Sequence, residues 1–501
     1  MNKAEKKDVK LVRDKSPGYR ERQRRAPLYE KLERHAAAHP HPFHVPGHKM
    51  GHSFDTGGSA RFGSVLELDL TEISGMDDLH DPAEVIAEAQ ELAAEAFGAE
   101  ETRFLIGGST VGNMALIMAV CRPGDKILVQ RNCHKSVFHG MMLARANPVY
   151  IVPAVDPDSG VAVGLRREDV ERALQAHPDA KAVFLTNPTY YGMGIDLAKM
   201  AATVHRYDVP LLVDEAHGSH YGFHSAFPPS AMQSGVDAAV QSTHKMTTAL
   251  TMSSMLHIQG NRINRERLAR CLAMLQSSSP SYLLMASLDL ARRHLVLEAA
   301  EEWDELFPLL AKLRESVAAL SWLELVGSGS GSVYTSMDPL KLMLTLRTRD
   351  MDGFGLQQML EDAGIYPELA DVGHVLLAAS SGTRAEDIHQ LILTLESAPC
   401  QPQRPFQRLV QPGMVSSSFL REQAMPIHEA MEAELIRIPL EQALGRIAGE
   451  MIIPYPPGIP LLTPGERMDA SLLELLKELR KSRVRFQGVD DAGLQTILVV
   501  R

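Results

Sequence analysis

The sequence predicts an α/β fold, with a mainly parallel sheet covered by helices on both faces and smaller α+β domains after it. From about residue 80 to residue 260, short apolar runs alternate with segments whose apolar residues recur every three or four positions, which is typical of βαβ units. The 501 residues, 45% of them hydrophobic, suffice for several domains around a large core. This composition excludes a collagen-like, low-complexity or largely disordered chain.

Sequence signals mark both ends of the first predicted helix in this region. Asp81 is the expected N-cap, Pro82 suits the first helical position, and Glu84 fits a capping box. Apolar residues then recur at helical spacing as far as Phe97, and Gly98 is a typical helix stop.

Six short apolar runs in this region are predicted strands, and helical segments separate nearly all of them. They cover residues 103–106, 126–130, 148–152, 182–186, 210–214 and 238–241. Because these runs are mainly apolar and alternate with helical segments, we expect helices to cover both faces of the sheet.

The rest of the chain predicts longer helices and two smaller units. Helical patterns cover about 263–275 and 282–318. Residues 340–395 mix strand patterns with a helix at about 354–363, which indicates an α+β domain. The three prolines of 399–405 are typical of a linker, and the last hundred residues are expected to form another small unit.

Charge and cysteine content limit the classes of function. Asp and Glu (62) outnumber Lys and Arg (51), and the resulting net charge of −11 disfavours nucleic acid or an anionic membrane as partner and suits cationic small molecules. The four cysteines are widely spaced and form no CxxC pair, which fits a reducing compartment and argues against a disulfide scaffold or a metal site. No apolar run reaches the roughly 18 residues of a membrane span. We therefore expect a cytoplasmic protein.

The first 25 residues are basic, with ten Lys or Arg against four Asp or Glu. No apolar segment follows them, so a secretory signal is not predicted. Such an arm could contact nucleic acid, but a solvated, partly helical start agrees better with the acidic remainder of the chain.

Polar residues at predicted strand ends are the candidate site, because ligands of open α/β sheets bind beyond the carboxyl ends of the strands. Gly107-Gly108-Ser109-Thr110 joins a strand to a helix and could hold a phosphate, although an ordinary capped turn explains it equally well. Asp214 ends one strand, and this acid either pairs with a cation or caps a solvated strand end. Lys245 follows the 238–241 strand and is either exposed or a Schiff-base lysine.

A fourth group, residues 131–136, contains His134, whose ring could stack on a flat ligand or complete a turn. Together the four groups are more informative than each one alone. Pyridoxal 5'-phosphate (PLP) needs a cradle for its phosphate, an acid that keeps its pyridine nitrogen protonated, and a lysine for its aldehyde. The sequence therefore predicts a PLP site.

Longer motifs surround these groups. The chain contains His44-Val-Pro-Gly-His-Lys49, Asp69-Leu-Thr-Glu72, Asp77-Asp-Leu-His80, Asn132-Cys-His-Lys135, Asn187-Pro-Thr-Tyr-Tyr191, Asp214-Glu-Ala-His217, Ser242-Thr-His-Lys245, Tyr455-Pro-Pro-Gly-Ile-Pro460 and Pro464-Gly-Glu466. In these motifs the chain resembles the bacterial Orn/Lys/Arg decarboxylases of fold-type I, and most of all the shorter biosynthetic arginine decarboxylase branch. The resemblance implies an aspartate aminotransferase-like fold with PLP as cofactor.

The resemblance also implies a role for each matching residue. Lys245 would bind the cofactor aldehyde, Asp214 would pair with the pyridine nitrogen, and His217 would lie near the ring edge as the third catalytic residue. The residues expected to stack on the ring or hold the phosphate are His134, Ser109, Thr110, Ser242, His244 and, from the neighbouring subunit, Ser277 or Ser278. A residue supplied by the neighbour implies a homodimer, or a larger homo-oligomer, with shared active sites.

The implied reaction is the loss of CO2 from a basic amino acid, followed by return of a proton to Cα from Lys245 or His217. Arginine, which would give agmatine for polyamine biosynthesis, is the expected substrate, and lysine or ornithine is the alternative. Glu466 and Glu72 are the first candidates for binding the distal cation of the substrate, and further candidates are Asp77, Glu368 and Glu450.

Three other functions stay open at this point. Transamination or β-elimination would use the same lysine and acid. A non-catalytic PLP-binding regulator or scaffold is disfavoured by the presence of Lys245 and Asp214, and nucleic-acid binding is disfavoured by the net charge. The expected domains are an N-terminal segment (1–70), a large PLP-binding domain (71–320), a small α+β domain (321–397) and a C-terminal decarboxylase domain (398–501).

Overall fold

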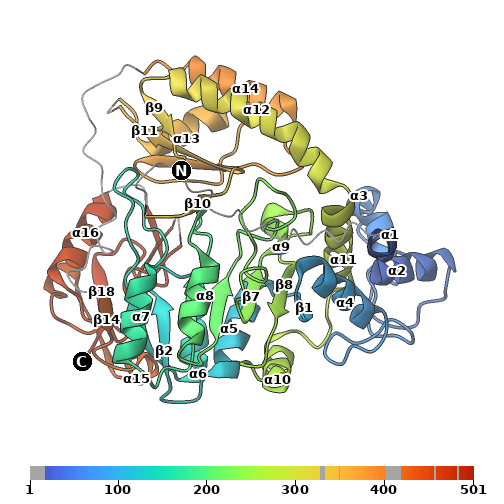
Figure 1. Ribbon diagram of the computed structural model, residues 1–501, viewed down its shortest axis with the longest axis horizontal. Coiled ribbons are helices and arrows are strands. Elements are labelled where there is room, and N and C mark those ends of the chain that lie inside the picture. Colours follow the sequence, from blue (N-terminus) through green and yellow to red (C-terminus); the bar gives the residue numbers. More distant parts are fainter. Residues whose placement is uncertain (1–16, 328–332, 349, 401–418, 456–457, 482–483) are drawn as a thin grey trace, which may run out of the picture.

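Within the part of the chain that the structure describes, the centre of the molecule is an eight-stranded sheet (Figure 1). The computed structural model describes residues 17–327, 333–348, 350–400, 419–455, 458–481 and 484–501. The strands, in spatial order, are β1 (Glu101–Leu105), β8 (Ser254–Ile258), β7 (Ala238–Gln241), β6 (Leu211–Asp214), β4 (Val183–Thr186), β2 (Lys126–Gln130), β3 (Asn147–Ile151) and β14 (Leu420–Glu422). From β7 to β3 neighbours run parallel, whereas β8 is antiparallel to β7 and β1, and β14 to β3. The prediction of a mainly parallel sheet is confirmed.

Helices cover both faces of this sheet (Figure 1). One face packs against α5 (Gly108–Val120), α6 (Lys135–Ala144) and α10 (Arg265–Leu275), and the other packs against α7 (Arg167–Ala176) and α8 (Leu197–His205). Successive strand residues alternate between the two cores: Leu212 packs into the first, and its neighbours Leu211 and Val213 pack into the second. Burial on both faces explains why the strands are continuous apolar runs in the sequence.

The first helix begins later than predicted. Helix α4 spans Val85–Phe97 and its N-cap position is Glu84, so the predicted N-cap at Asp81 is wrong. The carboxylate of Asp77 instead accepts hydrogen bonds from backbone N–H groups around the start of the helix, those of Ala83, Glu84, Ile86 and Ala87. An acceptor from the preceding loop thus satisfies the free N–H groups that a local cap would satisfy. Gly98 ends the helix with a φ of 71°, as predicted.

The remaining element predictions differ from the structure mainly at their ends. The strands at 126–130 and 238–241 are confirmed without change, and the boundaries of the other predicted strands move by one or two residues. The stretch 282–318 is two helices, α11 (Tyr282–Leu297) and α12 (Ala299–Ala319), because the backbone at Glu298 leaves helical geometry with a φ of −125°.

A second sheet, of four described strands, lies above the large one (Figure 1), in the region predicted to be α+β. Its strands are β9 (Leu323–Leu325), β11 (Lys341–Leu346), β12 (Leu369–Ala370) and β13 (His374–Ala378), and its helices include α13 (Gly353–Asp362) and α14 (Ala385–Glu396). A short pairing of β10 (Ser336–Met337) with β5 (Met193–Gly194) connects this region to the loop after β4. The first residue of β11, Lys341, lies near the carboxyl end of β6, where its side chain contacts His217.

The C-terminal residues form a smaller unit with its own core. Its elements are β15 (Leu435–Pro439) paired with β18 (Thr496–Val500), β16 (Ile453–Tyr455) paired with β17 (Arg485–Gln487), and the helices α15 (Ile427–Glu432), η1 (Leu440–Gln442) and α16 (Ala470–Lys481). Strand β14 precedes this unit and belongs to the large sheet. From residue 401 onward, the predicted linker lies outside the described residues.

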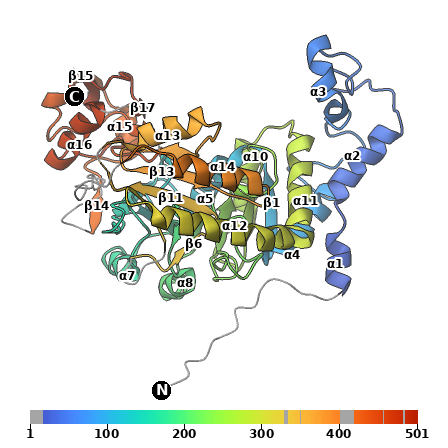
Figure 2. The same ribbon diagram turned by 90° about the horizontal axis from the view of Figure 1, so that it is seen from above.

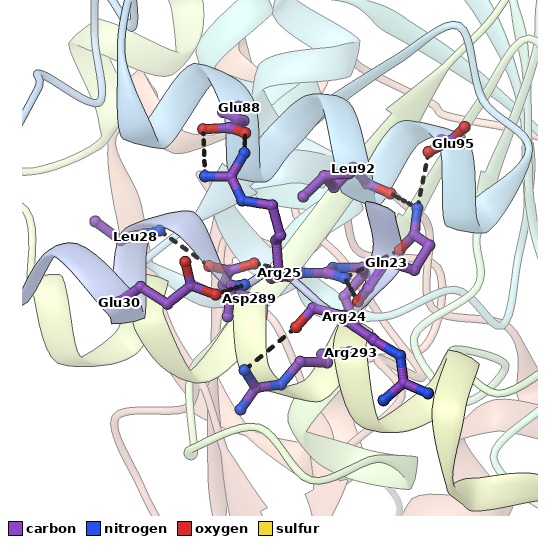
Figure 3. A network of polar contacts seen from close by, with 12 residues as sticks. Gln23, Arg24, Arg25, Leu28, Glu30, Glu88, Leu92, Glu95, Asp289 and Arg293 are labelled. Carbon is purple, nitrogen blue, oxygen red and sulfur yellow. Dashed lines mark hydrogen bonds and ion pairs between the residues drawn. The ribbon is translucent and has the colours of Figure 1, made fainter. Parts of the chain in front are cut away.

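Three of the described helices extend along one side of the molecule (Figure 2): α1 (Pro17–Gln23), α2 (Pro27–Ala37) and α3 (Thr56–Leu66). A fully buried ion pair on α11, with 2.7 Å between Arg292 Nη2 and Asp289 Oδ1, contacts the first two. Figure 3 shows Asp289 beside Leu28 of α2. Arg292 also donates to the carbonyl of Gln23, and Asp289 accepts from the N–H of Leu28. Residues 1–16 of the basic arm lie outside the described residues. None of the described helices is both long enough and apolar enough to cross a bilayer.

Candidate active site

Most of the predicted site residues meet where β6 and β7 end and α5 begins. Asp214 is the last residue of β6, and Lys245 lies on α9 (Thr243–Met246), directly after β7. The hydroxyl of Ser242 donates to that of Ser109 over 2.8 Å, which brings two predicted phosphate-binding groups together. Thr110 follows in the first turn of the 13-residue helix α5, whose N-terminal N–H groups favour an anion.

Asp214 is held rigidly and is only 3% exposed. Its Oδ2 accepts from Asn113 Nδ2 at 2.9 Å, and its Oδ1 accepts from the N–H of Ala216 at 3.1 Å. Burial raises the pKa of Asp214, and the charge of Lys245 and the hydrogen bond from Asn113 oppose that rise. Asn113 lies on α5, and the sequence reasoning did not find it because an Asn inside an apolar helix carries no local signal.

His217 lies between two lysines. Its Nε2 is 3.0 Å from Lys245 Nζ, and its Nδ1 is 3.2 Å from Lys341 Nζ, which belongs to the first residue of β11. Desolvation by the surrounding protein lowers the pKa of Lys245, and burial lowers that of Lys341 to about 8. Burial and the two ammonium charges hold the pKa of His217 well below its usual value, so its ring is neutral at pH 7.

Tyr190 packs its ring against His217, with 4.4 Å between the ring centroids. Its ring centroid lies 5.6 Å from Lys245 Nζ, and its hydroxyl donates to the carboxylate of Glu368. Glu368 is exposed and its negative charge favours the ammonium forms of both Lys245 and Lys341. This carboxylate therefore stands at the solvent side of the lysine–histidine group.

His134 and His244 lie near the same lysine. His134 is the N-cap residue of α6, and its Nδ1 accepts from the N–H of Ser136. Although His134 is exposed, desolvation around its ring and then the charge of Lys245 lower its pKa to about 4. The Nδ1–H of His244 donates to the carbonyl of Ser253 at 2.9 Å, and desolvation also lowers the pKa of this ring. Both rings are therefore neutral at pH 7.

Two of the predicted site residues, Ser277 and Glu72, lie near the start of α11. His80 Nε2 donates to the carbonyl of Ser277 at 2.8 Å, just before α11. Glu72 belongs to the same neighbourhood, because its charge acts on Tyr282, the first residue of α11. Among the hydrogen bonds and ion pairs of the described residues, none connects Ser277 or Glu72 to Lys245.

Glu466, predicted to bind the distal cation of the substrate, is buried and has its hydrogen-bond partners within the chain. Glu466 is 5% exposed, and its carboxylate receives two hydrogen bonds from Arg131, with Nε–Oε1 at 3.1 Å and Nη2–Oε2 at 2.7 Å. Its Oε2 also accepts from the N–H and the hydroxyl of Thr463, both at 2.9 Å. These partners occupy the carboxylate and make Glu466 part of the contact between the C-terminal unit and the large sheet.

The structure also gives the contacts of the other carboxylates that are candidates for binding the distal cation of the substrate. Asp77 caps α4, and Glu450 accepts from the N–H groups of Asp490 and Leu498. Of the five candidates, Glu368 is the one whose described contacts reach the group around Lys245.

The chain is similar to several known proteins. The profile described as "Orn/Lys/Arg decarboxylase, major domain" matches residues 26–327, and that described as "Orn/Lys/Arg decarboxylase, C-terminal domain" matches residues 409–494. The uncharacterized protein YaaO of Bacillus subtilis is 42% identical over 92% of this chain and 96% of its own. An arginine decarboxylase of Halalkalibacterium halodurans is 38% identical over 96% of this chain and 98% of its own.

A solved structure gives the same picture of the fold. The lysine decarboxylase LdcF of Francisella novicida superposes with a TM-score of 0.82, at 24% identity, over 95% of this chain and 81% of that one.

Proposed function

The chain belongs to the Orn/Lys/Arg decarboxylase family, and we propose that it is a PLP-dependent arginine decarboxylase, which converts L-arginine to agmatine and CO2. The observation that carries the proposal is the pair of Lys245 and Asp214 at adjacent strand ends, in a chain 38% identical to an arginine decarboxylase over 96% of its length. Agmatine production would place the reaction in polyamine biosynthesis, and the cytoplasm is the proposed location.

The residues present fit PLP. The amine of Lys245 can bind the aldehyde, the buried carboxyl of Asp214 can pair with the pyridine nitrogen, and the hydroxyls of Ser109 and Ser242 stand at a helix N-terminus suited to the phosphate. Further proposed contacts are His134 on the ring and Thr110 and His244 near the phosphate. Bound PLP supplies an electrophile for the substrate amine and a sink for the electrons left on Cα when CO2 departs.

The chain's own residues prepare this chemistry. Asp214, oriented by Asn113, would hold a proton at the pyridine nitrogen. His217 contacts Lys245 Nζ at 3.0 Å and can exchange a proton with it. Either group could then return a proton to Cα, and Tyr190, packed on His217, limits the access of water from that side.

Glu368 is the carboxylate that we propose for the distal cation of the substrate. It is exposed, its charge reaches Lys245, and the hydroxyl of Tyr190 fixes one of its oxygens. A guanidinium presents a planar set of N–H donors that a carboxylate can accept in pairs. The net charge of −11 agrees with a cationic substrate.

We further propose a homodimer in which Ser277, and with it Glu72, serves the partner's site. Both lie near the start of α11, and neither has a described hydrogen bond or ion pair with Lys245 of its own chain. The segment around α3 supports this proposal, because it extends from the body (Figure 2) and exposes large apolar side chains. These are Phe43, Val45, Phe54, Phe62 and Val65, with exposed fractions from 39% to 96%. A surface of this kind is typical of a protein–protein contact.

One experiment tests the proposed function. The purified chain, supplied with PLP, is incubated separately with arginine, lysine and ornithine, and the amine released is identified. We expect agmatine from arginine at the highest kcat/KM, and no amine from the Lys245→Ala variant. Cadaverine or putrescine as the main product would assign another basic amino acid, and a keto acid in place of an amine would indicate transamination.

A further inference from the structure

Two consecutive tyrosines of the loop after β4 each donate to a carboxylate at the second sheet. The hydroxyl of Tyr190 donates to Glu368, and that of Tyr191 donates to Asp371 Oδ2 at 3.2 Å. The two carboxylates flank the short strand β12, with Glu368 before it and Asp371 after it. The two hydrogen bonds therefore hold both ends of β12 against the loop whose Tyr190 packs on His217.

The two carboxylates differ in how many donors they already have. Asp371 Oδ1 accepts from two backbone N–H groups of the following turn, at 2.8 and 2.9 Å, and from His374 Nδ1 at 2.8 Å. Because Tyr191 donates to Oδ2, both oxygens of Asp371 are occupied. Among the hydrogen bonds of the described residues, Glu368 accepts one, from Tyr190. Asp371 therefore has a structural part, whereas Glu368 keeps an oxygen for a ligand.

His374 extends this contact to a second loop of the large sheet. Its ring is buried, and its Nε2 donates to the carbonyl of Ser159 at 3.0 Å. Ser159 lies in the loop after β3, where Asp156 Oδ2 accepts from its N–H at 2.8 Å and from its hydroxyl at 2.7 Å. Two hydrogen bonds thus cross between loops of the large sheet and the second sheet, and we call the four residues involved the Asp371 bridge: Tyr191, Asp371, His374 and Ser159.

A bound substrate would touch both of the parts that the Asp371 bridge connects. Its amine would lie at Lys245, which follows strand β7 of the large sheet, and its distal cation at Glu368, beside the second sheet. A guanidinium binds a carboxylate in a bidentate way that requires a fixed orientation, whereas an ammonium is a point charge that tolerates displacement. We propose that Asp371 is a positioning residue that orients Glu368 for a guanidinium and thereby favours arginine over lysine. The inference rests on the proposed function, because it assumes that Glu368 binds the distal cation of the substrate.

The test compares the two substrates in the full-length enzyme supplied with PLP. Tyr191→Phe removes one hydroxyl from the Asp371 bridge and keeps the ring. We expect the ratio of kcat/KM for arginine to kcat/KM for lysine to fall about tenfold, mainly through a higher KM for arginine, because the distal cation lies away from the bond that breaks. Tyr334→Phe is the matched control. It removes a hydroxyl from the same apolar cluster, but one that donates to the carbonyl of Gly327, and it should keep the wild-type ratio.

Two further measurements show whether Tyr191 acts through the bridge. Hydrogen–deuterium exchange over residues 368–376 should be faster in Tyr191→Phe than in the wild type. In a double-mutant cycle, Tyr191→Phe should change the substrate ratio little once Glu368→Gln is present. If Tyr191→Phe does not fold, His374→Leu replaces it, because it removes the other side-chain donor of Asp371 and should lower the ratio in the same way.

Several outcomes would overturn the inference. They are an unchanged ratio, an equal loss of kcat/KM for both substrates, unchanged exchange over residues 368–376, or an undiminished effect of Tyr191→Phe in the Glu368→Gln background. A wild-type enzyme that prefers lysine, or that releases no amine from arginine, would instead overturn the proposed function.

Discussion

Replacing Glu466 by Gln should weaken the attachment of the C-terminal unit and leave substrate preference unchanged. Arg131 and Glu466 are 3% and 5% exposed and form a bidentate ion pair. A neutral amide at position 466 would leave the buried guanidinium without a counter-charge. Removing one partner of a buried ion pair costs about 3–5 kcal/mol. Arg131 keeps its hydrogen bonds to the carbonyls of Pro460 and Leu461, so we expect the lower end, about 3 kcal/mol.

The decrease in melting temperature expected for Glu466→Gln depends on which part of the chain unfolds in the transition. The unfolding entropy is about 2 cal/mol/K per residue, so a cooperative transition of the whole chain would move by roughly 3 °C. If the C-terminal unit, from residue 427 onward, unfolds separately, the same free energy would lower its transition by more than about 10 °C. Calorimetry distinguishes these two cases.

The matched control is Glu474→Gln, which removes an exposed partner of Lys477 and should change the melting temperature very little. Steady-state kinetics with arginine and lysine complete the test. If Glu466→Gln melts like the wild type and loses kcat/KM for arginine alone, then Glu466 contacts the substrate and our account of the ion pair is wrong.

Three further substitutions test other parts of the structure. Asp214→Asn should retain PLP, as measured by absorbance, but lower turnover on the order of 100-fold or more, because an amide cannot hold the pyridine nitrogen protonated. Near-normal turnover would show that Asp214 does not hold that proton. Burial raises the pKa of Glu215 from 4.5 to about 8 in the folded chain, so folding favours its protonated form, and the stability that it contributes falls as the pH rises from about 5 to 8. The melting temperature of Glu215→Gln should lack that downward slope, and parallel curves for the two proteins would refute the assignment. Glu368→Gln should reduce kcat/KM for arginine on the order of tenfold, and less for lysine, in side-by-side kinetics; an equal loss for both substrates would exclude a selective contact with the guanidinium.

The sequence predicted six of the eight described strands of the large sheet, because runs of mainly apolar residues mark strands that are buried on both faces; β8 and β14 were not predicted. The strand 238–241 is apolar as far as its last residue, Gln241, and its limits can then be read directly. The start of α4 was misplaced because its cap comes from Asp77, eight residues before the helix, and local capping rules cover only adjacent positions. Local patterns therefore predict the elements better than their ends.

The site was predictable to the extent that its residues end strands. Asp214, Ser242 and Lys245 follow β6 and β7, and parallel strands bring such ends together. The ion pair of Glu466 could not be foreseen, because a carboxylate in a family motif is equally compatible with a substrate contact and with a structural ion pair. Its true partner, Arg131, is 335 residues away in the sequence.

Lys341 is the clearest example of a residue whose burial could not be predicted from the sequence. It precedes the apolar run Leu342–Leu346, where a lysine would normally be interpreted as an exposed strand end, and 124 residues separate it from His217. Its burial follows from tertiary structure, because the pairing of β10 with β5 brings the start of β11 against the loop after β4. Burying the ammonium of a lysine at the start of a strand costs free energy, and the adjacent residues of β11 do not offset that cost. The compensating interactions have to be sought across the fold, and here they are the ring of His217 and the charge of Asp338.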